Sequence, residues 1–181
     1  AIIRVSAFGP VRMMVPMLSS VDEVHQVLDI VGTIRNEFTR RGIAFDPNMP
    51  IGGMIEVPAA AICADVFARH LDFLSIGTND LIQYAVAIDR VNNEVSYLYD
   101  PLNPGVLRLV STTIGAGRSA GIPVAMCGEM AGDVRYTRLL LGLGLTEFSV
   151  HPAALLEIKH IVTHTDVRHA ETLAEEFLSD S

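Results

Sequence analysis

Three side chains that could take part in chemistry end or follow apolar, strand-like segments of this sequence. Glu56 ends one segment, Asp80 follows the next by one tight turn, and Cys127 ends another. In a parallel α/β fold the carboxyl ends of the strands share one rim, where loops carry functional residues. Two carboxylates on one rim suit a hard divalent cation such as Mg²⁺, which can also hold phosphate oxygens. The pattern therefore predicts a magnesium site formed by Glu56 and Asp80.

Each acid also has a structural alternative. Glu56 could cap the helix expected from Pro58, and Asp80 could stabilise the amino terminus of the helix that contains it. Either role would explain one carboxylate. Two carboxylates at the ends of adjacent strands favour the metal site.

The cysteines and histidines divide into functional and structural candidates. Cys127 stands at a strand end beside Gly128, which permits close backbone approach, so a functional thiol is favoured there. Cys63 lies in an alanine-rich helical pattern and is interpreted as a core residue. His160 and His164 are four residues apart on an expected helix, but a solvated or capping face is favoured over a zinc site.

The elements that must position these residues alternate between short apolar strands and amphipathic helices, which is typical of an α/β fold with parallel strands. Ser20 and Glu23 form a predicted capping box for a helix that Gly42 ends. Pro58 suits the first turn of another helix, and Gly121 closes a later one. Strands are expected at residues 12–16, 51–56, 72–76, 123–127 and 147–150.

Residues 1–181 show no internal repeat or composition break, so one domain is expected. Five strands do not close an eight-stranded barrel, which typically takes about 250 residues. The sequence therefore predicts either an open doubly wound sheet or a (β/α)₈ barrel that lacks its first strands. The opening segment has no initiator methionine and stops at Gly9-Pro10, so we expect it to be the tail of a helix that begins upstream.

Charge and composition exclude several classes of function. The net charge of −8 and the scattered basic residues argue against nucleic-acid binding. Lys159 is the only lysine, which leaves a poor candidate for Schiff-base chemistry or a phosphate-binding loop. Two cysteines form no disulfide framework, and no segment reads as a membrane span or signal peptide. We therefore expect a cytoplasmic protein without a membrane or nucleic-acid partner.

Four sequence blocks carry a resemblance to a known family. Residues 72–90 read DFLSIGTNDLIQYAVAIDR, residues 55–60 read IEVPAA, and residues 126–133 read MCGEMAGD, with a weaker block at 7–9 and 15–17. In this order they resemble the phosphoenolpyruvate (PEP)-utilising enzymes over nearly the whole chain. Residues 58–61 and 95–99 resemble Enzyme I of the phosphotransferase system more closely than pyruvate phosphate dikinase or PEP synthase.

The resemblance implies a (β/α)₈ barrel that transfers the phosphoryl group of PEP to a histidine on another domain and releases pyruvate. By that similarity Glu56 and Asp80 hold Mg²⁺, Asn79 and Asp80 contact the substrate, Arg90 offsets the phosphate charge, and Cys127 protonates the enol carbon. A thiol with a reference pKa of about 8.5 is mainly protonated at neutral pH and can act as an acid. The implied partners are a histidine phosphocarrier protein, reached through an N-terminal domain, and a second copy in a homodimer.

The sequence also departs from the family pattern. Members carry further phosphate-binding arginines on earlier barrel strands, and Arg4 at an expected helix end is not assigned that role. None of the six histidines matches the motif of the phosphate-accepting histidine. Residues 1–181 are therefore expected to be the C-terminal part of the PEP-binding barrel, able to hold the metal half of the site without turnover.

Two other functions remain open. A Mg²⁺-dependent aldolase or lyase acting on pyruvate or oxaloacetate would use Glu56 and Asp80 but would not need Cys127. A non-catalytic fragment for dimerisation or ligand sensing would bind PEP and Mg²⁺ without turnover. The sequence distinguishes neither sugar uptake from nitrogen regulation nor one phosphocarrier from another.

Overall fold

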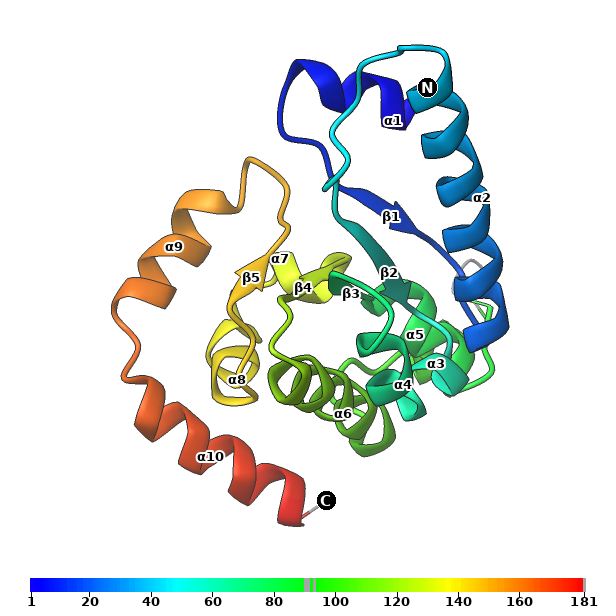
Figure 1. The fold of residues 1–181 in the computed structure, drawn as a ribbon. Helices are drawn as coiled ribbons and strands as arrows, with labels where there is room; N and C mark the ends of the chain where they lie inside the picture. The colour runs from blue at the N-terminus through cyan, green and yellow to red at the C-terminus, as the bar shows by residue number, and fades with distance from the viewer. Residues whose placement is uncertain (90–91, 93, 181) are drawn as a thin grey trace.

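The computed structural model describes residues 1–89, 92 and 94–180. In this part of the chain, parallel strands form a five-stranded sheet whose spatial order follows the sequence, β1-β2-β3-β4-β5 (Figure 1). The strands are β1 (Met13–Val15), β2 (Ile51–Ile55), β3 (Phe73–Gly77), β4 (Val124–Cys127) and β5 (Glu147–Phe148). Each expected strand is present, although β5 is shorter than the predicted segment 147–150.

The chain also has helices, most of which lie around the outside of the curved sheet (Figure 1). They are α1 (Ile2–Val5), α2 (Val21–Arg40), α3 (Pro58–Ile62), α4 (Ala64–Ala68), α5 (Thr78–Ala85), α6 (Pro104–Ala120), α7 (Glu129–Gly132), α8 (Thr137–Gly142), α9 (Leu155–Thr163) and α10 (Val167–Asp180), with 3₁₀ turns η1 (Ser6–Phe8) and η2 (Ser96–Leu98). None of the described helices has both the length and the apolar composition that a bilayer crossing requires.

The predicted helix ends are confirmed. Ser20 Oγ accepts the Glu23 N–H at 3.4 Å, and Glu23 Oε2 accepts the Ser20 N–H at 3.1 Å, which completes the capping box of α2. Gly42 follows the end of α2 with φ of 66°, and Gly121 ends α6 with φ of 72°. Both glycines adopt the left-handed conformation that commonly terminates helices.

One predicted helix differs from the helix that the structure shows. The helix that starts at Pro58 is interrupted at Cys63, which separates α3 from α4 and is exposed to solvent. The interpretation of Cys63 as a core residue is therefore wrong. The neighbouring alanines Ala61 and Ala64 are fully buried, whereas Cys63 between them is exposed.

The two faces of the sheet differ in chemistry. The outer face is apolar, and its side chains Ile55, Leu74, Ile76 and Met126 are fully buried under the helices. The inner face is more mixed: Met54 pairs with Ser75, Gly77 with Cys127 and Ala125 with Glu147, and Phe73 lies on the same face. Of the predicted site residues, Cys127 therefore lies on the inner face of the sheet.

The sheet curls toward its inner face. Arg12, just before β1, places its Nη1 4.0 Å from Oε2 of Glu147 on β5, at the opposite edge of the described sheet. In a flat sheet these edges would be about 19 Å apart, at about 4.8 Å per strand. The Arg12 guanidinium also lies 5.7 Å from the ring centroid of Phe73 on β3. This curvature confirms the α/β class and favours part of a barrel over an open doubly wound sheet.

Candidate active site

Glu56 is fixed at the carboxyl end of β2, where only 4% of the residue is exposed. The backbone N–H of Met17, in the loop after β1, donates to Glu56 Oε1 at 2.8 Å. Met17 has φ of 56°, a left-handed conformation that is uncommon for residues other than glycine. Helix α3 has Val57 as its N-cap and no side-chain capping bond. The capping role considered for Glu56 is therefore excluded, and the loop after β1 instead orients its carboxylate.

Asp80 lies in the first turn of α5 and interacts directly with Glu56. Burial raises the pKa of Glu56 above its ordinary value, and the hydrogen bond from Met17 opposes that rise. The charge of Asp80 and a side-chain hydrogen bond between the two acids raise the pKa of Glu56 further. The ionised form of Glu56 is therefore disfavoured, and a proton on Glu56 or a bound cation would stabilise this carboxyl group beside Asp80. The position of Asp80 also suits the helix dipole, so its structural and functional roles are compatible.

The acid pair fits Mg²⁺. Within residues 1–89, 92 and 94–180, no group of three or more His, Cys, Asp or Glu side chains is placed to hold a metal ion. Magnesium does not need such a group, because it usually keeps several waters and binds one or two carboxylates plus substrate phosphate. Gly77 leaves room beside the pair, since a Cβ there would lie 2.7 Å from Glu56 Oε2.

Cys127 ends β4 on the same face of the sheet as Ser75 of β3. Ser75 Oγ donates a weak hydrogen bond to Cys127 Sγ at 3.9 Å. Burial raises the pKa of the Cys127 thiol, the Ser75 hydrogen bond opposes this rise, and the charges of Glu56 and Asp80 add to it. The thiol is therefore protonated at neutral pH and able to donate a proton. The same interactions show that three of the predicted residues share one site.

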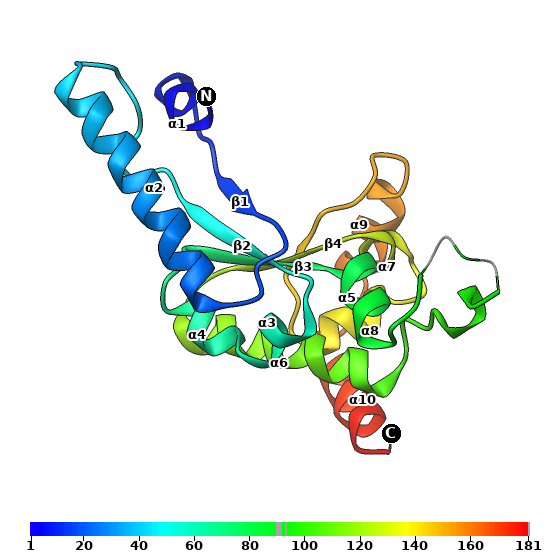
Figure 2. The same cartoon turned by 90° about the vertical axis from the view of Figure 1, so that its right-hand side faces the viewer.

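Asn79 occupies the second position of α5, directly before Asp80. Its Oδ1 accepts a hydrogen bond from the backbone N–H of Glu129 at 2.9 Å. Figure 2 shows α5 and α7, which carry these two residues, side by side beyond the ends of β3 and β4. Asn79, Gly128 and Glu129 line an open depression of about 580 Å³ whose lining does not include Glu56, Asp80 or Cys127.

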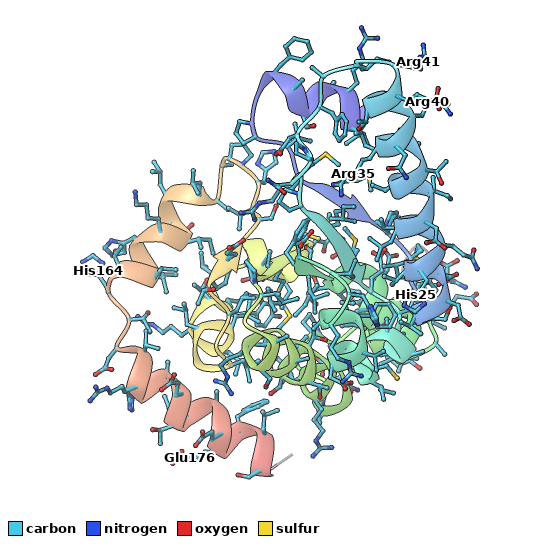
Figure 3. All side chains as sticks on the ribbon, in the orientation of Figure 1. His25, Arg35, Arg40, Arg41, His164 and Glu176 are labelled. Carbon is cyan, nitrogen blue, oxygen red and sulfur yellow. The ribbon has the colours of Figure 1, made fainter. Side chains whose placement is uncertain are left out.

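Three further residues were considered in the sequence analysis: Arg90, His160 and His164. Arg90, expected to offset the phosphate charge, lies outside the described residues. His160 and His164 are exposed, with ring centroids 4.2 Å apart, and Nδ1 of His164 lies 2.8 Å from the carbonyl oxygen of His160 at the end of α9. This contact confirms the prediction that these histidines belong to a capping face, because His164 caps the end of α9. Figure 3 shows His164 on the outer surface. A cavity of about 650 Å³ between α8 and α10 is lined in part by His164, but by none of Glu56, Asn79, Asp80 and Cys127.

Sequence reasoning missed three residues that organise the site: Met17, Ser75 and Thr78. Ser75 could have been found, because it stands two residues before Gly77 and strand alternation places both on the face of Cys127. Thr78 belongs to the GTND segment, but no local pattern shows that its hydroxyl bonds across to the carbonyl of Cys127 at 3.0 Å. Met17 lies in the weaker resemblance block at residues 15–17, but nothing in that block predicts its left-handed backbone, which is rare for its residue type.

Known proteins resemble this chain in sequence. The chain matches the family described as "PEP-utilising enzyme, PEP-binding domain" over residues 1–167. It is 53% identical over 178 residues to the phosphoenolpyruvate-protein phosphotransferase of Cupriavidus necator, covering 98% of this chain and 30% of that protein. It is 45% identical over 181 residues to the protein of the same name from Listeria monocytogenes, covering 100% of this chain and 32% of that protein. The chain thus spans about a third of the length of these curated relatives.

A solved structure supports the fold. A citrate lyase from Burkholderia xenovorans LB400 superposes with a TM-score of 0.62 at 20% sequence identity, covering 94% of this chain and 54% of that chain. At this level of identity the likeness supports the α/β barrel-type architecture and nothing about chemistry.

Proposed function

Because the chain belongs to the PEP-utilising enzymes through their PEP-binding domain, we propose that it forms the later part of the PEP-binding barrel of a phosphoenolpyruvate-protein phosphotransferase. The whole enzyme transfers the phosphoryl group of PEP to a histidine on another domain and releases pyruvate. The observation that carries this proposal is the convergence of Glu56, Asp80 and Cys127 at one end of the sheet.

Substrate binding is assigned to the acid pair and its neighbours. Glu56 and Asp80 hold Mg²⁺, which when bound supplies positive charge to the phosphate oxygens. Asn79 directs its amide NH₂ toward a phosphate oxygen, since Glu129 already occupies its carbonyl oxygen. Arg90 adds a second positive charge, as the family resemblance implies. Phosphoryl transfer depends mainly on positioning and charge stabilisation, which this set of groups supplies.

Proton transfer is assigned to Cys127. When the phosphoryl group leaves, the substrate becomes an enolate, and the Cys127 thiol gives its proton to the terminal carbon to form the methyl group of pyruvate. The resulting thiolate accepts a hydrogen bond from the Ser75 hydroxyl and later recovers a proton from solvent. A raised thiol pKa keeps the proton on Cys127 until that step.

The wider setting of the enzyme follows from the family resemblance. We assign residues 1–181 to one domain of a longer, cytoplasmic, homodimeric protein whose partner is a histidine phosphocarrier protein. The names of the relatives support the phosphotransferase activity and the protein acceptor.

The test uses the full natural-length protein with PEP labelled in its phosphoryl group, Mg²⁺ and a phosphocarrier protein. We expect one pyruvate for each label transferred to protein histidine, and no transfer without Mg²⁺. Cleavage of oxaloacetate without protein labelling would establish the lyase instead. Calorimetric binding of PEP and Mg²⁺ without turnover would establish a ligand-sensing role.

A further inference from the structure

The loops that follow β3 and β4 are tied together by side-chain-to-backbone bonds. Thr78 Oγ1 donates to the carbonyl oxygen of Cys127 at 3.0 Å, and the Glu129 N–H donates to Asn79 Oδ1 at 2.9 Å. Thr78 is completely buried. These bonds join residues that are 49 and 50 positions apart in sequence, so they are features of the tertiary structure.

Gly128 lies between the two bonds and permits the loops to approach. Its φ of 93° lies in the left-handed region that favours glycine. A Cβ at this position would collide with Thr78 Oγ1 and would lie 2.8 Å from Asn79 Oδ1. We name the two hydrogen bonds and Gly128 together the rim clasp.

The rim clasp determines which atoms of Asn79 remain for a ligand. A backbone N–H can only donate, so the Asn79 atom facing Glu129 must be the amide oxygen. The amide NH₂ of Asn79 is therefore directed away from that bond. A phosphate offers only acceptor oxygens and needs such a donor.

The same clasp restrains Cys127. Its carbonyl is held by Thr78, and its side chain lies on the inner face, 3.9 Å from Ser75 Oγ. The phosphate and the terminal carbon of PEP are opposite parts of one small, nearly planar molecule. The groups that meet them must therefore keep a fixed separation, and a misplacement of about 1 Å can cost about 100-fold in rate.

We propose that Thr78 and Gly128 are positioning residues that couple the phosphate contact of Asn79 to the proton donor Cys127 through the rim clasp. This inference rests on the proposed function. Thr78 acts on the proton-transfer step alone, because its hydroxyl bonds to Cys127 and makes no bond to Asn79. Gly128 acts on both groups, because a side chain there would displace both loops.

Exchange of the methyl protons of pyruvate in D₂O isolates the proton-transfer step. In the presence of Mg²⁺, the small fraction of Cys127 that has lost its proton to solvent removes a proton from the methyl group, which gives the enolate and a thiol. The thiol proton is replaced by deuterium from solvent, and the deuteron returns to the carbon. This is the reverse of the proposed protonation, and it involves no phosphate. The affinity for PEP, measured by calorimetry, reports the phosphate contact separately.

The main variant is Thr78→Val, which preserves the shape of the side chain and removes its donor. In the full natural-length protein we expect exchange to fall by about 10-fold or more, with PEP affinity within about threefold of wild type. Thr78→Ser, which restores the hydroxyl, should recover most of the exchange rate.

Thr113→Val is the matched control. Thr113 is also completely buried and donates its hydroxyl to the carbonyl oxygen of Leu109 at 2.9 Å within α6. It therefore undergoes the same chemical change away from the rim. The inference is overturned if Thr78→Val exchanges pyruvate protons at the wild-type rate, or if Thr78→Ser does not recover the exchange rate. It is also overturned if Thr113→Val loses as much exchange as Thr78→Val.

Asn79→Asp keeps the positioning claim testable if Thr78→Val does not fold. Its carboxylate can still accept the Glu129 N–H, but the donor to phosphate is gone. At saturating Mg²⁺ we expect the affinity for PEP to fall by a larger factor than the rate of pyruvate exchange. An equal loss of both would contradict the division of roles. If wild-type protein neither binds PEP nor exchanges pyruvate protons, the proposed function itself fails, which is a distinct result.

Discussion

At the carboxyl end of the sheet Glu56 faces a second acid, Asp80, whereas at the amino end Glu147 faces a base, Arg12. Glu56 is almost fully buried, while the side chains of Arg12 and Glu147 are 59% and 46% exposed. Both ends belong to the same curved strands. They place acids in opposite electrostatic surroundings.

The charges at the carboxyl end of the sheet suit ligand binding, whereas those at the amino end contribute to stability. The acid pair at the carboxyl end destabilises the folded chain unless a proton or a cation lies between its members. The ion pair at the amino end needs no ligand and contributes modestly, because solvent screens it. In barrel enzymes the carboxyl end carries the chemistry and the amino end the stability, and this chain shows that division in its charges.

The largest expected effect tests whether the carboxyl end performs chemistry. Cys127→Ala in the full natural-length protein should lower net pyruvate formation by about 10²- to 10⁴-fold, the usual contribution of a general acid. PEP and Mg²⁺ binding, measured by calorimetry, should remain near wild type because the thiol touches neither the metal nor the phosphate in the proposed scheme. Near wild-type turnover by the alanine variant would remove Cys127 from the mechanism.

The next effect concerns the metal. Glu56→Gln and Asp80→Asn should each weaken Mg²⁺ binding by at least about 10- to 100-fold, the loss that removing even an outer-shell partner causes. Each substitution removes an anionic oxygen from a hard cation's shell. Titration calorimetry with Mg²⁺ measures the change. If Asp80→Asn kept its Mg²⁺ affinity, Asp80 would return to the helix-stabilising role.

In metal-free buffer, Glu56→Gln should stabilise the folded protein, although the same substitution weakens Mg²⁺ binding. The pKa of Glu56 is raised in the folded state, so its contribution is fully present below the ordinary glutamate pKa and is lost as pH rises through the raised value. Glu56→Gln does not titrate and should therefore melt higher than wild type near pH 7, but not near pH 4, in metal-free buffer. Thermal unfolding at both pH values measures this, and a lower melting temperature for Glu56→Gln near pH 7 would contradict it.

Replacing a glutamate by glutamine at the amino end of the sheet should have a smaller effect on stability. Glu147→Gln should lower the free energy of unfolding by no more than about 1 kcal/mol, because exposed ion pairs contribute about 0–1 kcal/mol. The loss should shrink at high salt, and Mg²⁺ affinity should not change. A gain in stability, or a loss of Mg²⁺ binding, would show that the two ends are not electrostatically distinct.

The smallest effect is expected for Cys63→Ala. Cys63 is exposed at the break between α3 and α4, so neither melting temperature nor turnover should change measurably. Its thiol should also react with iodoacetamide faster than that of Cys127, whose raised pKa and partial burial slow alkylation. Faster labelling of Cys127 would contradict the environments assigned to the two cysteines.

Much of the site was predictable because parallel strands bring their carboxyl ends to one rim. Apolar runs located the strands, so Glu56, Asp80 and Cys127 could be assigned to that rim without coordinates. The core interpretation of Cys63 failed for a related reason. Helical periodicity assumes an unbroken helix, and the break at Cys63 changes which side faces the sheet.

Local patterns in the amino-acid sequence were sufficient to identify the strand positions, the ends of α2 and α6, and the residue types at the rim, because each depends on neighbours within a few positions. The orientation of Glu56 by Met17, the rim clasp and the Arg12–Glu147 pair required tertiary contacts. The Glu56–Met17 hydrogen bond, for example, joins residues that are 39 positions apart. Such contacts depend on how strongly the sheet curls and on which loop conformations the packing stabilises, and local patterns specify neither.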